Sequence, residues 1–403
     1  MSRRIWKADT FFKKVHDTLL TEYWNRNALP MPTKHTSTGR LRFETAWAHL
    51  PAEVRDRLGR ELVPVNALCK KDARDDLLNE AMKRRDVIPF DEDDLLSASH
   101  YDLAMILFLY CPDALATVDA AMSIDSMKAN HEFVSDDPAP GPLPDLSLGS
   151  IEHMQQMFAQ YLRSRWGAVR CVLEPYEADG RFIVRYFHEE SLRPVPSISA
   201  ESVEYDVRRP VDFASLVYLP DENRIMVRAR RETDRRFLVE QFAEVALGRP
   251  QAYFASRDRE MFDFDIFRNP DGWLTAIPGT GVQRIDILTI EFIAPSRELR
   301  HLKMDFRSLR SMRDLHRAAA EHSVCLATCD IRGVKLRFHL VDENDRSRTR
   351  TVELKRPNRS TLNDTEVDRI IRAHLQEWGI DGSQRSGDFQ ALVRRSLGQA
   401  SLL

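Results

Sequence analysis

The sequence is poor in the residues that build cross-links and phosphate-binding loops. Its five cysteines are odd in number and scattered, with no C-x-x-C pair, which argues against a disulfide framework or a zinc site. Only 15 of the 403 residues are glycines, and the motifs G-x-x-x-x-G-K-[ST], G-x-G-x-x-G, G-x-S-x-G and H-E-x-x-H are absent. The common nucleotide hydrolases, serine hydrolases and zincins therefore have little support, and we expect no cofactor.

Long apolar runs are also missing. The longest, from Leu103 to Cys111, ends at Pro112 and is far shorter than the roughly 20 residues that span a bilayer. The first ten residues include basic side chains, but Lys13, Lys14 and Asp17 interrupt the stretch that follows, so no secretory signal is expected. These features predict a cytoplasmic protein without a membrane partner.

The length favours two domains, because 403 residues exceed what one hydrophobic core usually holds. A proline-rich stretch supplies the boundary, since four prolines alternate between residues 138 and 144 and prevent regular hydrogen bonding there. We therefore predict an α-helical domain over residues 1–131, an extended linker over 132–150 and a larger α+β domain over 151–403. The net charge of −3 requires any basic surface to be local.

Local patterns give the fold class. Before the linker, helix signals dominate: Pro51 opens one helix and Ser99 caps another. After it, a hairpin is predicted around residues 171–187, and three stretches (214–247, 285–321 and 334–378) each contain two strands and then a helix. In the second stretch, Ser308 is the expected cap of a helix over 309–321. The sequence predicts an α+β protein with antiparallel strand–strand–helix units.

One short motif suggests catalysis. The segment from Val352 to Pro357 reads VELKRP, which resembles the E-x-K half of the PD-(D/E)xK nuclease motif. The resemblance implies that Glu353 shares a divalent ion with a second carboxylate, Asp342 or Asp345, while Lys355 orients water or stabilises developing charge. Both aspartates, however, fall at or beyond the turn between the two predicted strands.

A simpler interpretation explains the same residues. Val334, Leu336, Phe338 and Leu340 alternate towards a core, as do Val352 and Leu354, which sends Glu353 and Lys355 to the opposite face together with Lys335 and Arg337. Opposite charges then meet across the strands. This interpretation predicts a surface ion pair.

The stretch MFDFDIF is a second candidate. Alternation places Asp263 and Asp265 on one face, close in sequence to Asp258 and Glu260, and paired carboxylates could bind a hard cation. The alternative is a half-buried strand in which Phe262, Phe264 and Phe267 supply apolar surface. We favour the strand. We also predict that Trp166, Trp273 and Trp378 pack near the ends of elements.

The third candidate is basic. Arg228 and Arg230 lie on one side of a predicted strand, and Arg235 and Arg236 fall in the first turn of the next helix, where free N–H groups attract anions. Further arginines follow on a later helix and on a hairpin tip. These are Arg310, Arg313, Arg317, Arg346, Arg348 and Arg350. If they share a face, they form a surface for nucleic-acid phosphates.

Charge clusters without catalytic signatures favour a docking role. We therefore expect a non-enzymatic subunit of a larger assembly, in bacterial defence or DNA processing, that docks a nucleic-acid backbone or an acidic protein partner. The alternative is a metal-dependent nuclease built on Glu353 and Lys355.

Overall fold

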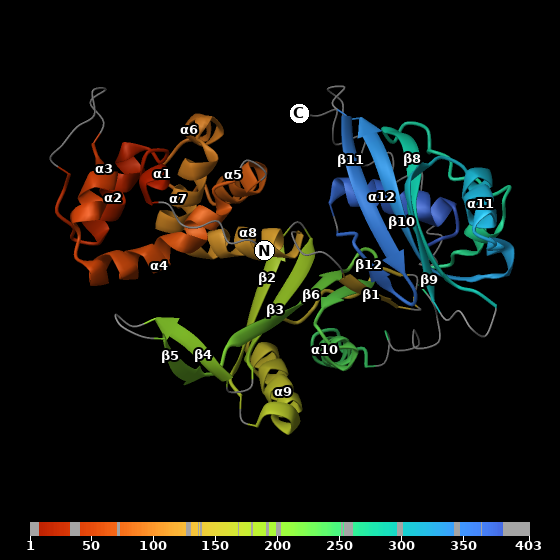
Figure 1. The fold of residues 1–403 in the computed structure, drawn as a ribbon. Coiled ribbons are helices and arrows are strands. Elements are labelled where there is room, and N and C mark those ends of the chain that lie inside the picture. The colour runs from red at the N-terminus through yellow and green to blue at the C-terminus, as the bar shows by residue number, and fades with distance from the viewer. Residues whose placement is uncertain are drawn as a thin grey trace. The chain divides into compact units, whose positions relative to one another are not determined.

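The computed structural model describes residues 8–32, 41–70, 73–125, 130–135, 137, 139–167, 169–178, 180–190, 193–198, 203–250, 253, 261–295, 301–341, 347–363 and 365–381. The chain divides into two compact units, Met1–Ile124 and Asp125–Leu403, coloured red to orange and yellow to blue in Figure 1. None of the described helices has the length and apolar character needed to span a bilayer.

The first unit is built from helices. They are α1 (Ala8–Phe12), α2 (Asp17–Arg26), α3 (Phe43–His49), α4 (Ala52–Leu68), α5 (Arg74–Lys83), α6 (Glu92–Ser97), α7 (His100–Tyr110) and α8 (Pro112–Asp125). Helix α7 begins with the predicted Ser99 cap, and Asp102 completes a capping box. Seven of its eleven residues are buried, so α7 forms the centre of this unit's core.

The second unit contains one large antiparallel sheet. Its strands run in the order β2-β3-β6-β7-β1-β12-β11-β10-β8-β9, with β4 and β5 paired separately. The strands are β1 (Asn130–Val134), β2 (Cys171–Ala178), β3 (Arg181–Glu189), β4 (Arg193–Ile198), β5 (Val203–Arg208), β6 (Val211–Leu219), β7 (Arg224–Arg228), β8 (Val282–Ile293), β9 (Leu302–Leu309), β10 (Asp330–Val341), β11 (Ser347–Lys355) and β12 (Arg359–Ser360). The helices are α9 (Leu148–Trp166), α10 (Glu232–Val245), α11 (Met312–Glu321) and α12 (Glu366–Glu377), with short 3-10 turns η3 (Asp265–Arg268) and η4 (Leu326–Thr328). The predicted α+β class is confirmed.

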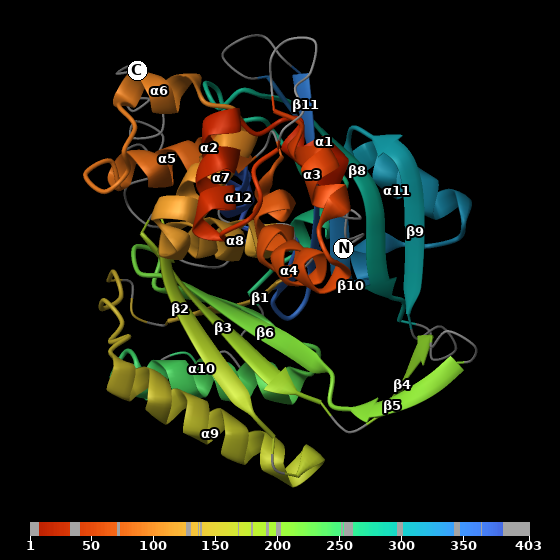
Figure 2. The ribbon, with the colours of Figure 1, turned by 90° about the vertical axis from the view of Figure 1, so that its left-hand side faces the viewer.

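Two hydrophobic cores lie on opposite faces of this sheet. Helices α9 and α10 pack on β2, β3, β6 and β7, and Figure 2 shows both helices beneath β2, β3 and β6. Helices α11 and α12 pack on β8, β10 and β11. Strand β1 contributes to both cores, since Phe133 packs against the first and Val134 against the second. Neighbouring residues of a strand point to opposite faces of the sheet, so the two cores lie on opposite faces.

Two segments begin at other residues than the sequence predicts. Residues 132–134 lie in β1, the central strand, so the proline-rich segment begins after them. That segment is held along the second unit, since the backbone N–H groups of Gly141 and Asp145 donate to Pro220 and Ala246, both at 2.8 Å. Helix α11 begins at Met312 with Ser311 as its cap, because β9 extends to Leu309 and leaves no room for the start predicted at Ser308.

The middle of the sheet holds a buried ionic cluster instead of apolar side chains. Glu132 on β1 accepts from Arg372 on α12 at 2.8 and 3.0 Å and also from Arg224 on β7. Asp381 lies 3.7 Å from Arg224 and 3.8 Å from Arg372. Burial alone would raise the pKa of Glu132, but the two guanidinium groups lower it to about 2. The cluster links the two halves of the sheet through charge.

Candidate nucleic-acid interface

Two of the predicted phosphate-binding arginines, Arg228 and Arg350, form hydrogen bonds with other residues of the protein. The Arg228 side chain is only 8% exposed and donates to Asn130 and, at 2.6 Å, to Asn363. Arg350 forms a bidentate pair with Asp368 at 2.8 and 3.2 Å and donates to the Thr361 carbonyl. Such contacts satisfy the donors that a phosphate would need.

The arginines around the start of α10 are neutralised. Arg230 is 75% exposed but contacts Glu190 at 2.8 Å and Asp212 at 3.2 Å. Arg235 donates to the carbonyls of Ala229 and Arg230, and burial lowers its pKa. Arg236 pairs with Glu232 one turn earlier on the helix. Nearby carboxylates and backbone carbonyls therefore already bind these three arginine side chains.

The clearest exposed basic surface lies at β9 and α11. Met312, Leu315 and Ala319 face the core, and this i, i+3, i+7 spacing turns Arg313 and Arg317 towards solvent. Both side chains are 73% exposed. Arg310 is exposed as well, in the short connection before the helix. We call these three residues the α11 arginine surface.

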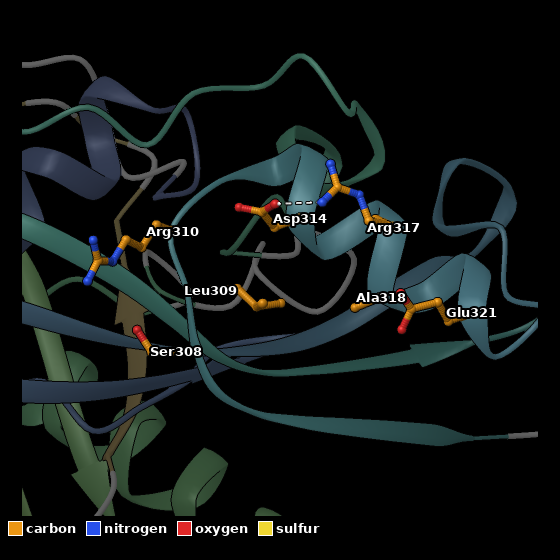
Figure 3. Close-up of a pocket in the computed structure, with 7 residues that line it drawn as sticks. All are labelled: Ser308, Leu309, Arg310, Asp314, Arg317, Ala318 and Glu321. Carbon is orange, nitrogen blue, oxygen red and sulfur yellow. Dashed lines mark ion pairs between the residues drawn. The ribbon is translucent and has the colours of Figure 1, made fainter.

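A hollow of about 410 Å³ lies beside this surface (Figure 3). Its lining residues are Ser308, Leu309, Arg310, Asp314, Arg317, Ala318 and Glu321. Arg317 pairs loosely with Asp314 at 3.7 Å, and Arg313 pairs with Asp271 at 3.0 Å. Within the described part of the chain Arg310 has no ion-pair partner, and Figure 3 shows its guanidinium directed away from Asp314. The hollow is open and has both signs of charge on its walls.

The remaining predicted arginines lie on the β10–β11 hairpin. Arg348 is exposed near the start of β11. Arg346 falls outside the described residues, as do Asp342 and Asp345, the two carboxylates proposed for the nuclease motif.

Glu353 and Lys355 form part of a charged chain across the sheet. The Lys355 ammonium lies 2.9 Å from Glu353 and 2.8 Å from Glu291 on β8. Lys335 stands opposite Glu353 in the register of β10 and β11, so the predicted cross-strand meeting of charges is confirmed. Burial alone would lower the pKa of Lys355, but the carboxylates of Glu291 and Glu353 raise it. A lysine cation thus lies between the two carboxylates.

The MFDFDIF stretch is not a strand. Phe262, Phe264 and Phe267 are fully buried, as predicted, but residues 265–268 form the η3 turn. Asp263 pairs with Arg356 and Asp265 with Arg268, each at 3.3 Å. Asp258 and Glu260 lie outside the described residues. Among the residues that the structure does describe, no three potential metal ligands are grouped closely enough to hold an ion.

Trp273 was misjudged from the sequence. It is 72% exposed, whereas Trp378 is buried as predicted. The tight turn at Asn269–Gly272 just before it is a signal that could have placed Trp273 at the surface.

Comparison with known proteins adds no family assignment. Neither the scan of protein-family models nor the search of curated proteins found a match to this chain.

Proposed function

We propose that this chain is a non-enzymatic subunit of a larger assembly, of the kind that acts in bacterial defence or DNA processing, and that it docks nucleic acid through the α11 arginine surface. The observation that carries the proposal is Arg310, which is exposed beside the hollow without a carboxylate partner among the described residues. An unpaired guanidinium is the side chain best suited to bind a phosphate.

The ion pairs of the other two arginines do not oppose this role. Asp271 is 67% exposed and Asp314 is 44% exposed, and exposed pairs typically contribute only about 0–1 kcal/mol. Phosphate contacts release condensed counterions, which is the main source of affinity for a nucleic-acid backbone. Arg313 and Arg317 can therefore exchange their carboxylates for phosphates at little cost.

The position of the helix favours anions further. Arg310 precedes the α11 N-terminus and Arg313 lies in its first turn. The backbone dipole at this end attracts negative charge. A phosphate here would be held by the guanidinium groups and favoured by the helix, without any contact that reads a base.

The test compares two sets of substitutions that remove charge without reversing it. Arg310→Gln, Arg313→Gln and Arg317→Gln are combined in one variant, and Arg230→Gln with Arg236→Gln in the control. Affinity for duplex and single-stranded DNA is measured by fluorescence anisotropy at several salt concentrations. We expect the first variant to reduce the log–log salt slope by roughly 2 to 3 and the control to change it little. Circular dichroism checks that both variants are folded.

Two results would contradict the proposal. The unmodified protein could fail to bind nucleic acid even at low salt, or the control could lose as much affinity as the first variant. Binding of an acidic protein that the same three substitutions abolish, without binding of nucleic acid, would favour the alternative partner.

The second candidate function is a metal-dependent nuclease. It is favoured by the convergence of Glu353, Glu291 and Lys355 on one face of the sheet. We expect no cleavage of DNA or RNA with Mg²⁺ or Mn²⁺. Cleavage by the unmodified protein that Glu353→Gln and Lys355→Ala both abolish would establish the nuclease instead.

A further inference from the structure

An exposed aromatic side chain, Trp273, lies on a segment that contacts α11. Its indole is 72% exposed, and it makes no ring contact with another aromatic side chain in the described part of the chain. A ring exposed to this extent is accessible to a ligand.

The backbone holds Trp273 in this position. Gly272 N–H donates to the Asn269 carbonyl at 3.0 Å, and Asp271 N–H donates to the Asn269 side chain at 3.0 Å. A Cβ atom on Gly272 would lie 2.7 Å from the Ile266 carbonyl oxygen, so the turn requires glycine there. On the other side, Leu274 packs against the core. The segment that presents the indole is therefore built by local hydrogen bonds and packing.

Two contacts join this segment to α11. His316 lies 3.1 Å from the Phe267 carbonyl oxygen, and Arg313 contacts Asp271 at 3.0 Å. Trp273 follows Asp271 by two residues, so the exposed tryptophan belongs to the segment that Arg313 contacts. An exposed aromatic ring beside exposed cations is the combination that binds single-stranded nucleic acid, because bases stack on the ring while arginines contact phosphates.

We propose that the ligand of this surface is single-stranded nucleic acid, with one base stacked on Trp273 and the adjoining phosphates at Arg310 and Arg313. The inference rests on the proposed function and deepens it. A duplex keeps its bases inside the helix and presents only phosphates to the arginines, so the surface should bind single strands more tightly than duplexes. Stacking depends little on base identity, and sequence preference should be weak.

The experiment separates stacking from charge by changing the ligand. Binding of oligothymidylate is compared with binding of an abasic oligonucleotide of the same length, which keeps the phosphates and lacks the bases. The full chain is compared with Trp273→Ala, with Trp273→Phe as the matched control that keeps an aromatic ring, and with the triple arginine variant. We expect the unmodified protein to prefer oligothymidylate by roughly 5- to 150-fold, the range for one stacked base.

The variants should divide cleanly. Trp273→Ala should lose the preference while it still binds the abasic strand, Trp273→Phe should retain most of the preference, and the triple arginine variant should lose affinity for both ligands. If the unmodified protein binds both ligands equally, or if Trp273→Ala leaves the preference unchanged, the stacking role is wrong and the docking proposal stands. If neither ligand is bound at low salt, both are wrong.

Discussion

Replacing Glu132 with glutamine tests the ionic cluster at the centre of the sheet. The side chain is fully buried and faces the guanidinium groups of Arg224 and Arg372. Glu132→Gln keeps the shape of the residue and removes its charge, which leaves two buried cations with Asp381 and the partly exposed Glu222 as the remaining acidic partners.

The pKa sets the expected magnitude. The pKa of Glu132 falls from 4.5 to about 2 on folding, and each pH unit of difference corresponds to about 1.4 kcal/mol. The charged form therefore contributes about 3 kcal/mol to the free energy of unfolding at pH 7, and breaking a buried pair typically costs about 3–5 kcal/mol. Because the folded pKa is the lower one, this contribution is present above pH 4.5 and disappears as the pH falls towards 2. At pH 3 less than half of this contribution should remain.

Hydrogen exchange in urea measures this effect within the second unit. Peptides that cover β1 and β7 report the opening of the sheet separately from the helices of the first unit. We expect the difference between the unmodified protein and Glu132→Gln to be about 3 kcal/mol at pH 7 and to narrow at pH 3. Glu222→Gln is the control, since that carboxylate is 31% exposed and should matter by at most about 1 kcal/mol.

A variant as stable as the unmodified protein at pH 7 would refute this reasoning. So would a difference that does not depend on pH, because the loss would then come from packing and not from charge.

Three other measurements test the fold. Gly141→Ala should lower the free energy of unfolding, measured by urea titration, by roughly 1–3 kcal/mol, because the added Cβ would lie 1.8 Å from the Tyr218 hydroxyl. The control is Gly149→Ala in α9, where an added Cβ meets no atom within 4 Å, and this variant should not be destabilised. The second unit should lose stability as the pH falls from 6.5 to about 4, because burial lowers the pKa of His131 to about 4 and the unfolded chain then binds the extra proton; a urea midpoint that stays constant over this window would contradict it. A chain that begins at residue 125 should give a soluble second unit, whereas one that begins at residue 139 lacks β1 and should not, as solubility and hydrogen exchange will show.

Local features of the fold could be predicted because they depend on neighbouring residues. The hairpin of β2 and β3 turns at Gly180 with φ of +73°, and α10 and α12 are followed by Gly248 and Gly379, also at positive φ. The predicted alternation of buried and exposed side chains in β10 and β11 is also confirmed. In each case a steric requirement or a two-residue period leaves a direct trace in the sequence.

The central strand could not be predicted because its buried residues are polar. In β1, Asn130 and Glu132 are almost fully buried while His131 is only partly so. A search for alternating apolar residues therefore passes over it. Its partners lie about 90 and 230 residues away, and pairing at such distances leaves no local pattern.

The candidate site was only partly predictable for a similar reason. The sequence shows where arginines cluster, but not which carboxylates reach them. Arg313 and its partner Asp271 are 42 residues apart, and Arg228 resembles a surface residue until the strand beside it is known to be β1. The α11 arginine surface could be predicted in part, because Arg313 and Arg317 lie on one helix at a regular spacing, whereas Arg310 lies in the connection before it.

The position of β1 in the sequence also determines when its two neighbouring strands become available during synthesis. The strand is made before either of its neighbours, and β12 follows about 225 residues after it. At synthesis rates of about 5–20 residues per second, that interval lasts roughly 10–45 s. During it, β7 can already pair with one edge of β1 while the other edge stays open and Glu132 still lacks Arg372. An open edge of this kind can pair with other chains. The nascent second unit is therefore most vulnerable to aggregation, and most dependent on chaperones, in the seconds before its last strand and helix emerge.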